Sequence, residues 1–293
     1  MTSVVAPAGV STRAPAVTQR LRRPRPQVGV HVGLVVLVVA SLAPYVFMLV
    51  TSLKDNQQYH ENFWAPAFPF HWENYATAWE QVRPYLIASV IVAAASVVGI
   101  VAVSLLAAFV FARFSFPGRN ALFALIAALM MVPSIASLIP LFVMMRNLEL
   151  LNTYWVLIIP HIATGAVLGT IIMRTFIAGI PQTLFDAAQL DGASHLRIFR
   201  SIMMPLSLPV IGTVALVNVQ GVWNDFFWPL LTISENDLRT MSVGLLFFQG
   251  QSGTEFGPLF AGYLLASLPL LLLFVFFSKY FLAGVQGGIP GSH

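Results

Sequence analysis

Long apolar runs restrict the folds available to this chain more than any other feature. Six of them, each about 20 residues or longer, lie at about 28–50, 86–112, 120–145, 154–178, 206–232 and 259–282. None alternates apolar and polar residues as the strands of a membrane barrel do. Because hydrocarbon offers the backbone no hydrogen-bond partner, such runs predict membrane-spanning helices. The expected fold class is an all-α polytopic membrane protein with six transmembrane helices.

The composition agrees with this and excludes several kinds of site. Charged residues make up 9% of the chain and hydrophobic residues 58%, whereas about 25% of a soluble domain is charged. The chain has no cysteine, which excludes disulfides, thiolate metal sites and a cysteine nucleophile. Its six histidines show neither HxxH nor HxxxH spacing. We therefore expect no metal site and no cofactor.

Basic residues are distributed unequally between the two sides of the predicted membrane domain. With the N-terminus in the cytoplasm, eleven lie inside and four (Lys54, Arg83, Arg146 and Arg239) outside. The inner set is Arg13, Arg20, Arg22, Arg23, Arg25, Arg113, Arg119, Arg174, Arg197, Arg200 and Lys279. This bias follows the positive-inside rule and predicts cytoplasmic N- and C-termini. It also explains the pI near 9.7 without a nucleic-acid partner.

The chain divides into three parts on this basis. Residues 1–27 predict a disordered basic cytoplasmic tail, 28–285 a six-helix membrane domain, and 286–293 a cytoplasmic C-terminal tail. The outer segment 54–85 is aromatic, and Pro66 and Pro69 exclude one continuous helix there. Two interpretations of this segment stay open, an interfacial loop on the lipid headgroups and a surface for an extracellular solute-binding protein.

A polar insert at 179–209 interrupts the apolar pattern on the cytoplasmic side. Pro181 suits a first helical position, Gly192 a left-handed helix end, and Ser194 the N-cap of a second helix. One apolar face then follows helical spacing: Phe199, Ile202, Met203 and Leu206. A pair of short amphipathic helices is therefore predicted.

Two features of the insert suggest contact with a partner. Small residues (Ala187, Ala188, Gly192 and Ala193) would let another backbone approach closely. Asp191 lies near a helix C-terminus, where the dipole disfavours an acid, so we expect a compensating cation such as Arg197, Arg200 or one on another chain. Residue chemistry alone leaves two alternatives equally open, docking to a soluble partner and resting on the bilayer.

The stretch DAAQLDGASHLRIFRSIMMPLSLP (186–209) resembles the EAA loop of ABC-importer permeases. The resemblance implies that this loop binds an ATPase subunit, with these coupling residues: Asp186, Ala187, Ala188, Asp191, Gly192, Ala193, Phe199 and Pro205. Asp186 departs from the usual glutamate, which puts one contact to the partner in doubt.

Further stretches resemble the maltose-type branch, carbohydrate uptake family 1, and specifically its shorter permease subunit. They are TSLKDNQQ (51–58), WENY (72–75), ARFSFPGRN (112–120), IPLFVMMRNLELLNTYWVLIIP (139–160), WNDFFWPL (223–230) and KYFLAGVQGG (279–288), in which Gln286 replaces a usual lysine. The resemblance implies a MetI-like permease fold. It also implies four kinds of partner: a second permease chain, two ABC ATPase subunits, an extracellular solute-binding protein and the bilayer.

Catalytic chemistry is not expected of this chain. Its two lysines, Lys54 and Lys279, do not follow a GxxxxG, so there is no Walker A loop. No GxSxG, dinucleotide fingerprint or paired catalytic carboxylates occur either. We therefore expect a non-catalytic subunit with no catalytic residues.

Polar residues late in the fifth run are the candidates for a substrate pathway: Asn218, Trp223, Asn224 and Asp225. At about 1.5 Å per residue, Asp225 would lie about 28 Å along a helix from Leu206, near the outer leaflet. An ionisable residue there indicates a functional site, and amides beside aromatic rings suit a polyol. The alternative is an aromatic belt with a buried helix–helix hydrogen bond.

The function expected is that of a permease subunit of an ATP-driven sugar importer, forming half of the translocation pathway. One alternative is the same machinery for a non-sugar solute such as a glycerol phosphate ester. A third, of another class, is an ion-coupled secondary carrier, which commonly uses intramembrane acids and broken helices.

Overall fold

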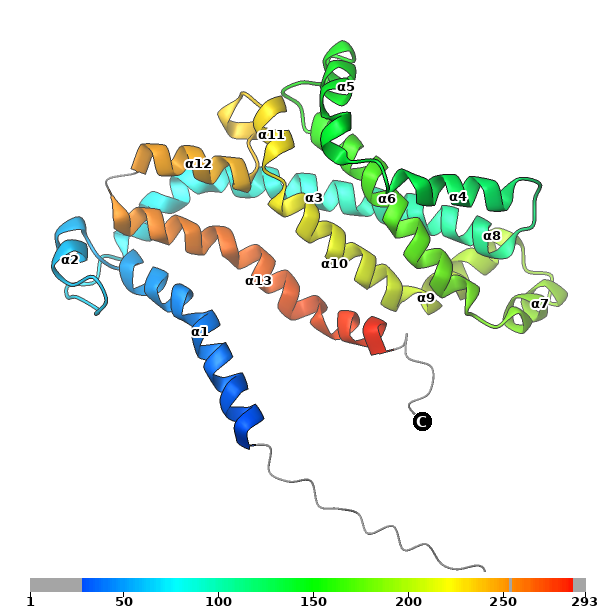
Figure 1. Ribbon diagram of the computed structural model, residues 1–293, viewed down its shortest axis with the longest axis horizontal. Coiled ribbons are helices and arrows are strands. Elements are labelled where there is room, and N and C mark those ends of the chain that lie inside the picture. Colours follow the sequence, from blue (N-terminus) through cyan, green and yellow to red (C-terminus); the bar gives the residue numbers. More distant parts are fainter. Residues whose placement is uncertain (1–27, 253–254, 287–293) are drawn as a thin grey trace, which may run out of the picture. The chain divides into compact units, whose positions relative to one another are not determined.

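The computed structural model describes residues 28–252 and 255–286, and every regular element in these two ranges is helical (Figure 1). The chain divides into two compact units, Met1–Pro44 and Tyr45–His293. The first contains most of α1 (Val28–Ser52), and the second contains the other elements. The predicted tail 1–27 lies outside the described residues, as does the predicted C-terminal tail except for Gln286.

Among the described residues, four helices are long and apolar enough to cross a membrane, and up to six spans result if each of two bent pairs counts as one. The bent pairs are Arg119–Leu129 with Ser134–Asn147, and His195–Leu206 with Leu208–Asn224, which differ in direction by 72°. The four long helices are α1, α3 (Glu73–Arg113), α6 (Trp155–Ala178) and α13 (Phe256–Gln286). They confirm the all-α polytopic fold class, with each helix on the expected run. The α3 helix extends well beyond the predicted 86–112 and includes the end of the aromatic outer segment.

The third predicted span is not one helix. It consists of α4 (Arg119–Leu129) and α5 (Ser134–Asn147), whose axes differ by 96°. Pro133 lies at the break and has an extended backbone. Proline lacks an N–H and disfavours helix in the residue before it, so α4 does not continue into α5. The prediction of a continuous 120–145 helix was therefore wrong.

The fifth predicted span, 206–232, is also interrupted. The α10 helix (Leu208–Asn224) ends before Asp225, whose backbone is extended, and a separate short helix α11 follows (Phe227–Thr232). The Asp225 carboxylate accepts a hydrogen bond from the Trp228 backbone N–H at 3.4 Å. Local bonds of this kind compete with a continuous helix, so the break removes Asp225 from the helical ladder.

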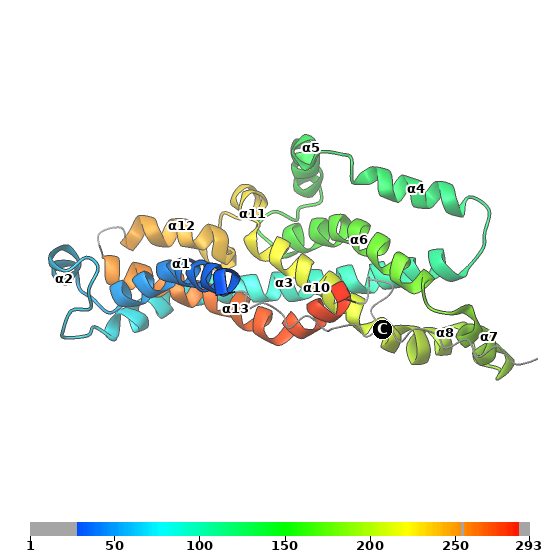
Figure 2. The same cartoon turned by 60° about the horizontal axis from the view of Figure 1, so that its bottom comes forward.

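The second unit also contains two short elements and one helix that the apolar pattern did not predict. These are α2 (Asn56–Glu61), the 3-10 turn η2 (Asn236–Leu238) and α12 (Met241–Ser252). Within the second unit, Figures 1 and 2 both show α2 and α12 at one end, with α7 (Gln182–Leu190) and α8 (His195–Ile198) at the other. At twelve residues, α12 is shorter than a span and does not change the span count.

Small residues bring α3 and α6 close together. A Cβ on Gly169 would lie 2.3 Å from the Ser104 hydroxyl, and one on Gly99 would lie 2.3 Å from Ile162. Gly165 is equally restricted, by Ile100 and by Asn218 of α10. Since lipid provides no hydrophobic drive between helices, close backbone packing of this kind holds membrane helices together.

Candidate functional site

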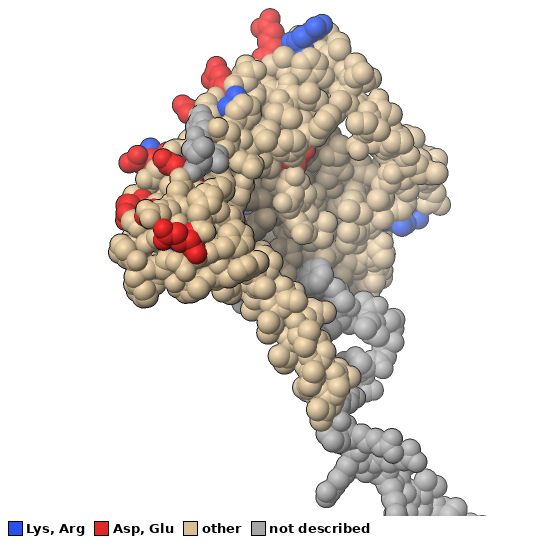
Figure 3. All heavy atoms as spheres, turned by 60° about the vertical axis from the view of Figure 1, so that its left-hand side comes forward, with Lys and Arg blue, Asp and Glu red and all other residues tan. Residues whose placement is uncertain are grey.

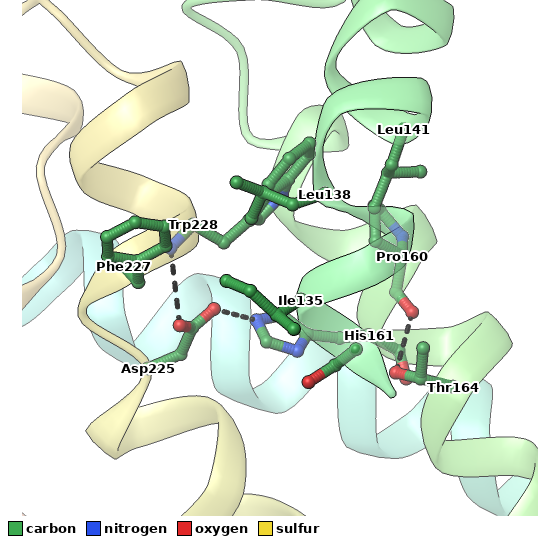
Figure 4. Close-up of a pocket in the computed structure, with 10 residues that line it drawn as sticks. Ile135, Leu138, Leu141, Pro160, His161, Thr164, Asp225, Phe227 and Trp228 are labelled. Carbon is green, nitrogen blue, oxygen red and sulfur yellow. Dashed lines mark hydrogen bonds and ion pairs between the residues drawn. The ribbon is translucent and has the colours of Figure 1, made fainter. Parts of the chain in front are cut away.

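Two adjoining hollows lie where α6 meets the α10–α11 break. One, of about 430 Å³, is lined on its polar side by His161, Thr164, Asn218, Asn224 and Asp225. The other, of about 360 Å³, shares His161, Thr164 and Asp225 and is closed by apolar residues of α5 and α11 (Figure 4). No lysine or arginine lines either hollow.

Asp225 is the best-connected side chain of the hollows. Its Oδ2 lies 3.4 Å from Nε2 of His161, and its Oδ1 accepts the Trp228 N–H, as Figure 4 shows. Its backbone carbonyl accepts a hydrogen bond from Ser242 of α12 at 2.6 Å. The break in the fifth span is therefore tied both to α6 and to α12, and it turns a carboxylate toward the hollow.

His161 and Thr164 are site residues that the sequence reasoning missed. The Thr164 hydroxyl donates to the Pro160 carbonyl at 2.9 Å, which holds the side chain against its own helix. The available signal was a histidine in the middle of an apolar span, because an ionisable residue there marks a functional site. The spacing between histidines does not reveal a histidine that pairs with a carboxylate.

The other predicted pathway residues divide between hollow and core. Asn218 and Asn224 line the hollow, and each amide donates at 2.8 Å to a carbonyl four residues earlier in α10. Trp223 does not line it. With 7% of its surface exposed, Trp223 belongs to the hydrophobic core near the outer end, because it lies on the opposite face of α10.

The polar insert at 179–209 forms the predicted helix–turn–helix. It comprises α7 (Gln182–Leu190), α8 (His195–Ile198), the π-turn η1 (Phe199–Met203) and α9 (Met204–Leu206). Gly192 adopts a φ of 76° and the Ser194 hydroxyl accepts the Arg197 N–H at 3.4 Å, as predicted for both. Pro181 lies at the N-cap, one position before the one expected.

The apolar face of the insert packs against the protein itself. Phe185, Ile198, Phe199 and Met203 are buried in a core cluster with residues of α3, α6 and α10, and Ala188 and Ala193 pack against it. Phe199 is 9% exposed and lies 5.4 Å from the Phe109 ring. The structure thus places Phe199 inside, on the wall between the insert and the spans, and not on its outer surface.

The opposite face of the insert is exposed and partly apolar. Asp186, Ala187, Asp191, Gly192 and Pro205 lie on the surface, as expected of docking residues. Among the described residues Asp191 forms no ion pair with Arg197 or Arg200. Two further side chains stand out, Leu190 at 89% and Leu196 at 65% exposure. Sequence reasoning missed both, although leucines beside a helix end and an N-cap break an otherwise polar pattern.

At the outer end, Lys54 organises the segment before α3. It is fully buried and donates to the carbonyls of Asn62 and Phe63, and burial lowers the pKa of its ammonium. The Asn74 amide donates to the carbonyls of Ser52 and Lys54, at 2.9 Å each. Figure 3 shows acidic side chains gathered on one face of the molecule. The exposed acids in or beside α2, α3, η2 and the start of α13 are Asp55, Glu61, Glu73, Glu80, Glu235, Asp237 and Glu255.

Comparison with known proteins shows the family to which the chain belongs. Residues 99–286 match the family described as binding-protein-dependent transport system inner membrane component. The probable ABC transporter permease protein YurM of Bacillus subtilis (strain 168) is 33% identical over 89% of this chain and 88% of its own length. The melibiose/raffinose/stachyose import permease protein MelC of the same organism is 30% identical over 86% of this chain and 92% of its own.

A solved structure shows the same fold. A chain of a bacterial ABC transporter involved in the import of the acidic polysaccharide alginate superposes with a TM-score of 0.75, at 20% identity, over 87% of this chain and 96% of that one. Together with the four to six apolar spans, these matches make the protein a multi-pass membrane protein. The chain belongs to the family of binding-protein-dependent transport system inner membrane components.

Proposed function

We propose that this chain is the permease subunit of an ATP-driven sugar importer and forms half of the solute pathway. A second permease chain supplies the other half, two ABC ATPases drive the cycle, and an extracellular binding protein delivers the solute. The observation that carries the proposal is the α6–α10 hollow, which combines a carboxylate, an imidazole, a hydroxyl and two amides. The protein itself performs no catalysis.

The chemistry of the hollow favours an uncharged polyol. Hydroxyl groups need both donors and acceptors, and Asp225, His161, Thr164 and the asparagines provide both. The rings of Phe227 and Trp228 line the adjoining hollow, where the C–H faces of a sugar can stack. An anionic solute such as a glycerol phosphate ester would meet the Asp225 carboxylate with no lysine or arginine beside it, which disfavours that alternative.

The names of relatives support the sugar class. One imports melibiose, raffinose and stachyose according to its name. Another is the arabinooligosaccharides transport system permease protein AraQ of Halalkalibacterium halodurans, 36% identical over 61% of this chain and 64% of its own length. Neutral sugars are what these two names have in common, and the hollow of this chain suits the same class.

The exposed face of the insert, opposite the one that packs against the spans, is the proposed contact with the ATPase. Asp186, Ala187, Asp191 and Gly192 would meet the partner directly, with Leu190 and Leu196 as exposed apolar anchors. Ala188, Ala193 and Phe199 act differently, because they lie on the side that packs against the spans and would carry motion inward. Pro205 ends the insert where α10 begins.

Solute uptake into proteoliposomes tests the proposal. The chain is co-purified with its permease and ATPase partners and supplied with the binding protein. We expect uptake of a neutral oligosaccharide that requires ATP, and at least a tenfold loss in Asp225→Asn or Thr164→Val. Glu80→Gln, an exposed acid away from the hollow, serves as the control. ATP-independent uptake driven by an ion gradient would support a secondary carrier, and selective uptake of a phosphate ester would contradict the sugar assignment.

Cross-linking tests the docking face separately. The chain lacks cysteine, so Leu190→Cys introduces a single thiol at an insert position that is 89% exposed. We expect it to cross-link to the ATPase and the yield to change on ATP binding. Gln57→Cys, exposed on α2 at the other end, should give no product. Equal yields from both positions would contradict the docking face.

A further inference from the structure

Arg113, the last residue of α3, contacts three elements at once. One terminal nitrogen donates to the Gln182 side chain in the first position of α7, at 2.8 Å. The other donates to the carbonyls of Ile177 and Ile180, at the end of α6 and just beyond it. The guanidinium carbon lies 3.8 Å from the centre of the Phe185 ring of α7.

We propose that Arg113 is the positioning residue that clamps the coupling insert to α3 and passes its movement to the outer side. The proposal rests on the proposed function, since it concerns how an ATPase-driven movement reaches the spans. Arginine suits this task because its planar fork can bond in several directions while a face covers an aromatic ring. Its charge also complements the carbonyl end of the α6 dipole.

Neighbouring contacts also join the C-terminal end of α3 to the second half of the insert. The Phe114 ring, next to Arg113, lies 5.1 Å from the His195 ring of α8. Phe109, one turn earlier, contacts Phe199 of η1. Both halves of the insert therefore contact α3, and Arg113 supplies the polar part of this contact.

The N-terminal half of α3 is also anchored to neighbouring elements, so a displacement at Arg113 has a route to them. Tyr85 donates to Asn236 of η2 at 2.8 Å, and the Ser89 hydroxyl accepts the Met241 N–H of α12 at 2.7 Å. A helix of 41 residues is about 60 Å long at 1.5 Å per residue. When Arg113 is intact, the insert, the α3 helix and the α12 region move together as one body.

Coupling efficiency is the measurement that separates a clamp from a merely structural contact. We expect Arg113→Ala and Gln182→Ala complexes to keep the ATPase bound and to hydrolyse ATP. Solute transported per ATP should fall at least fivefold in Arg113→Ala and less in Gln182→Ala. Arg113→Lys should recover part of the loss, because a point charge can still bond the α6 carbonyls but cannot reach Gln182 as well. Arg119→Ala is the matched control, since the Arg119 guanidinium bonds its sequence neighbours Phe114 and Asn120 and not the insert, within the part of the chain that the structure describes.

A ratio of solute to ATP within twofold of wild type in Arg113→Ala would overturn the proposal. If that variant does not assemble, Arg113→Lys and Gln182→Ala decide by the same ratio. A second measurement needs no partner: spin labels at Ser115 and Gln189, which line one hollow of about 290 Å³ with Arg113. Arg113→Ala should broaden their distance distribution, and an unchanged distribution contradicts the clamp. Absence of ATP-driven transport in wild type would reject the proposed function but leave this measurement valid.

Discussion

The contact between His161 and Asp225 is the interaction on which the hollow depends at the residue scale. The two side chains are 17% and 22% exposed, so water screens them only partly. We expect Asp225→Asn and His161→Gln each to lower the free energy of unfolding, and the double variant to lose less than their sum. The difference, a coupling of about 1 kcal/mol, is measured by unfolding the purified chain in detergent.

The same experiment contains its own control. Asp186, also an aspartate, is exposed and accepts a 3.0 Å bond from the Gln182 side chain, four residues earlier in the same helix. Asp186→Asn should change stability by less than about 0.5 kcal/mol, as surface substitutions usually do. Full additivity of the Asp225 and His161 effects would show that the pair contributes nothing.

Residue-level prediction from sequence succeeded where one residue and its neighbours along the chain determine the conformation. Gly192 and Ser194 took the predicted left-handed and capping roles because helix ends impose those requirements locally. Asp225 was predicted as a site residue because an acid in an apolar run is costly. Its partner His161, 64 positions earlier, could not be predicted, since pairing depends on how α6 and α10 pack. Trp223, also predicted as a pathway residue, does not line the hollow, because chain position does not reveal which face of α10 is buried.

At the scale of elements, the contact between α3 and α6 depends on the absence of a side chain at Gly169. A methyl group there would lie 2.3 Å from the Ser104 hydroxyl and 3.0 Å from its Cβ. We expect Gly169→Ala to destabilise the chain by about 1–3 kcal/mol, the usual cost of overpacking. Adding Ser104→Ala should restore part of this, although it removes the weak bond to the Ala166 carbonyl. Unfolding in detergent measures all three variants.

Gly250→Ala is the matched substitution, in α12, where nothing lies within 4 Å of the added methyl group. It should be neutral or stabilising by up to about 1 kcal/mol, because alanine favours helix over glycine. A Gly169→Ala variant as stable as Gly250→Ala would mean that α3 and α6 adjust freely, contrary to the close packing described.

The prediction of elements was good for position and poor for continuity. Apolar length placed every span, because the thickness of the bilayer sets a length that is visible in sequence. It did not predict the breaks at Pro133 and Asp225, where backbone bonds and packing outweigh hydrophobicity. Nor did it predict α12, whose twelve residues are too few for a span but enough to cover α3 and α13.

At the scale of the whole molecule, one helix connects regions that the sequence presents as separate. The aromatic outer segment, the α12 region and the cytoplasmic insert all attach to α3, through Asn74, Ser89 and Arg113. The two hollows lie on α6 and α10, and both of these helices pack against α3. The α3 helix therefore connects the insert both with the helices that line the candidate site and with α12.

This arrangement requires the insert and the α2 end to lie on opposite sides of the membrane, with the insert in the cytoplasm. The unequal distribution of basic residues favours that orientation and predicts a cytoplasmic location for residues 1–27 and 286–293 as well. In a chain without cysteine, Glu61→Cys should react with a membrane-impermeant maleimide in intact cells. Gln189→Cys should react only after permeabilisation. Both side chains are exposed, so burial does not explain a difference, and labelling of Gln189→Cys in intact cells would reverse the topology and remove the insert from any cytoplasmic ATPase.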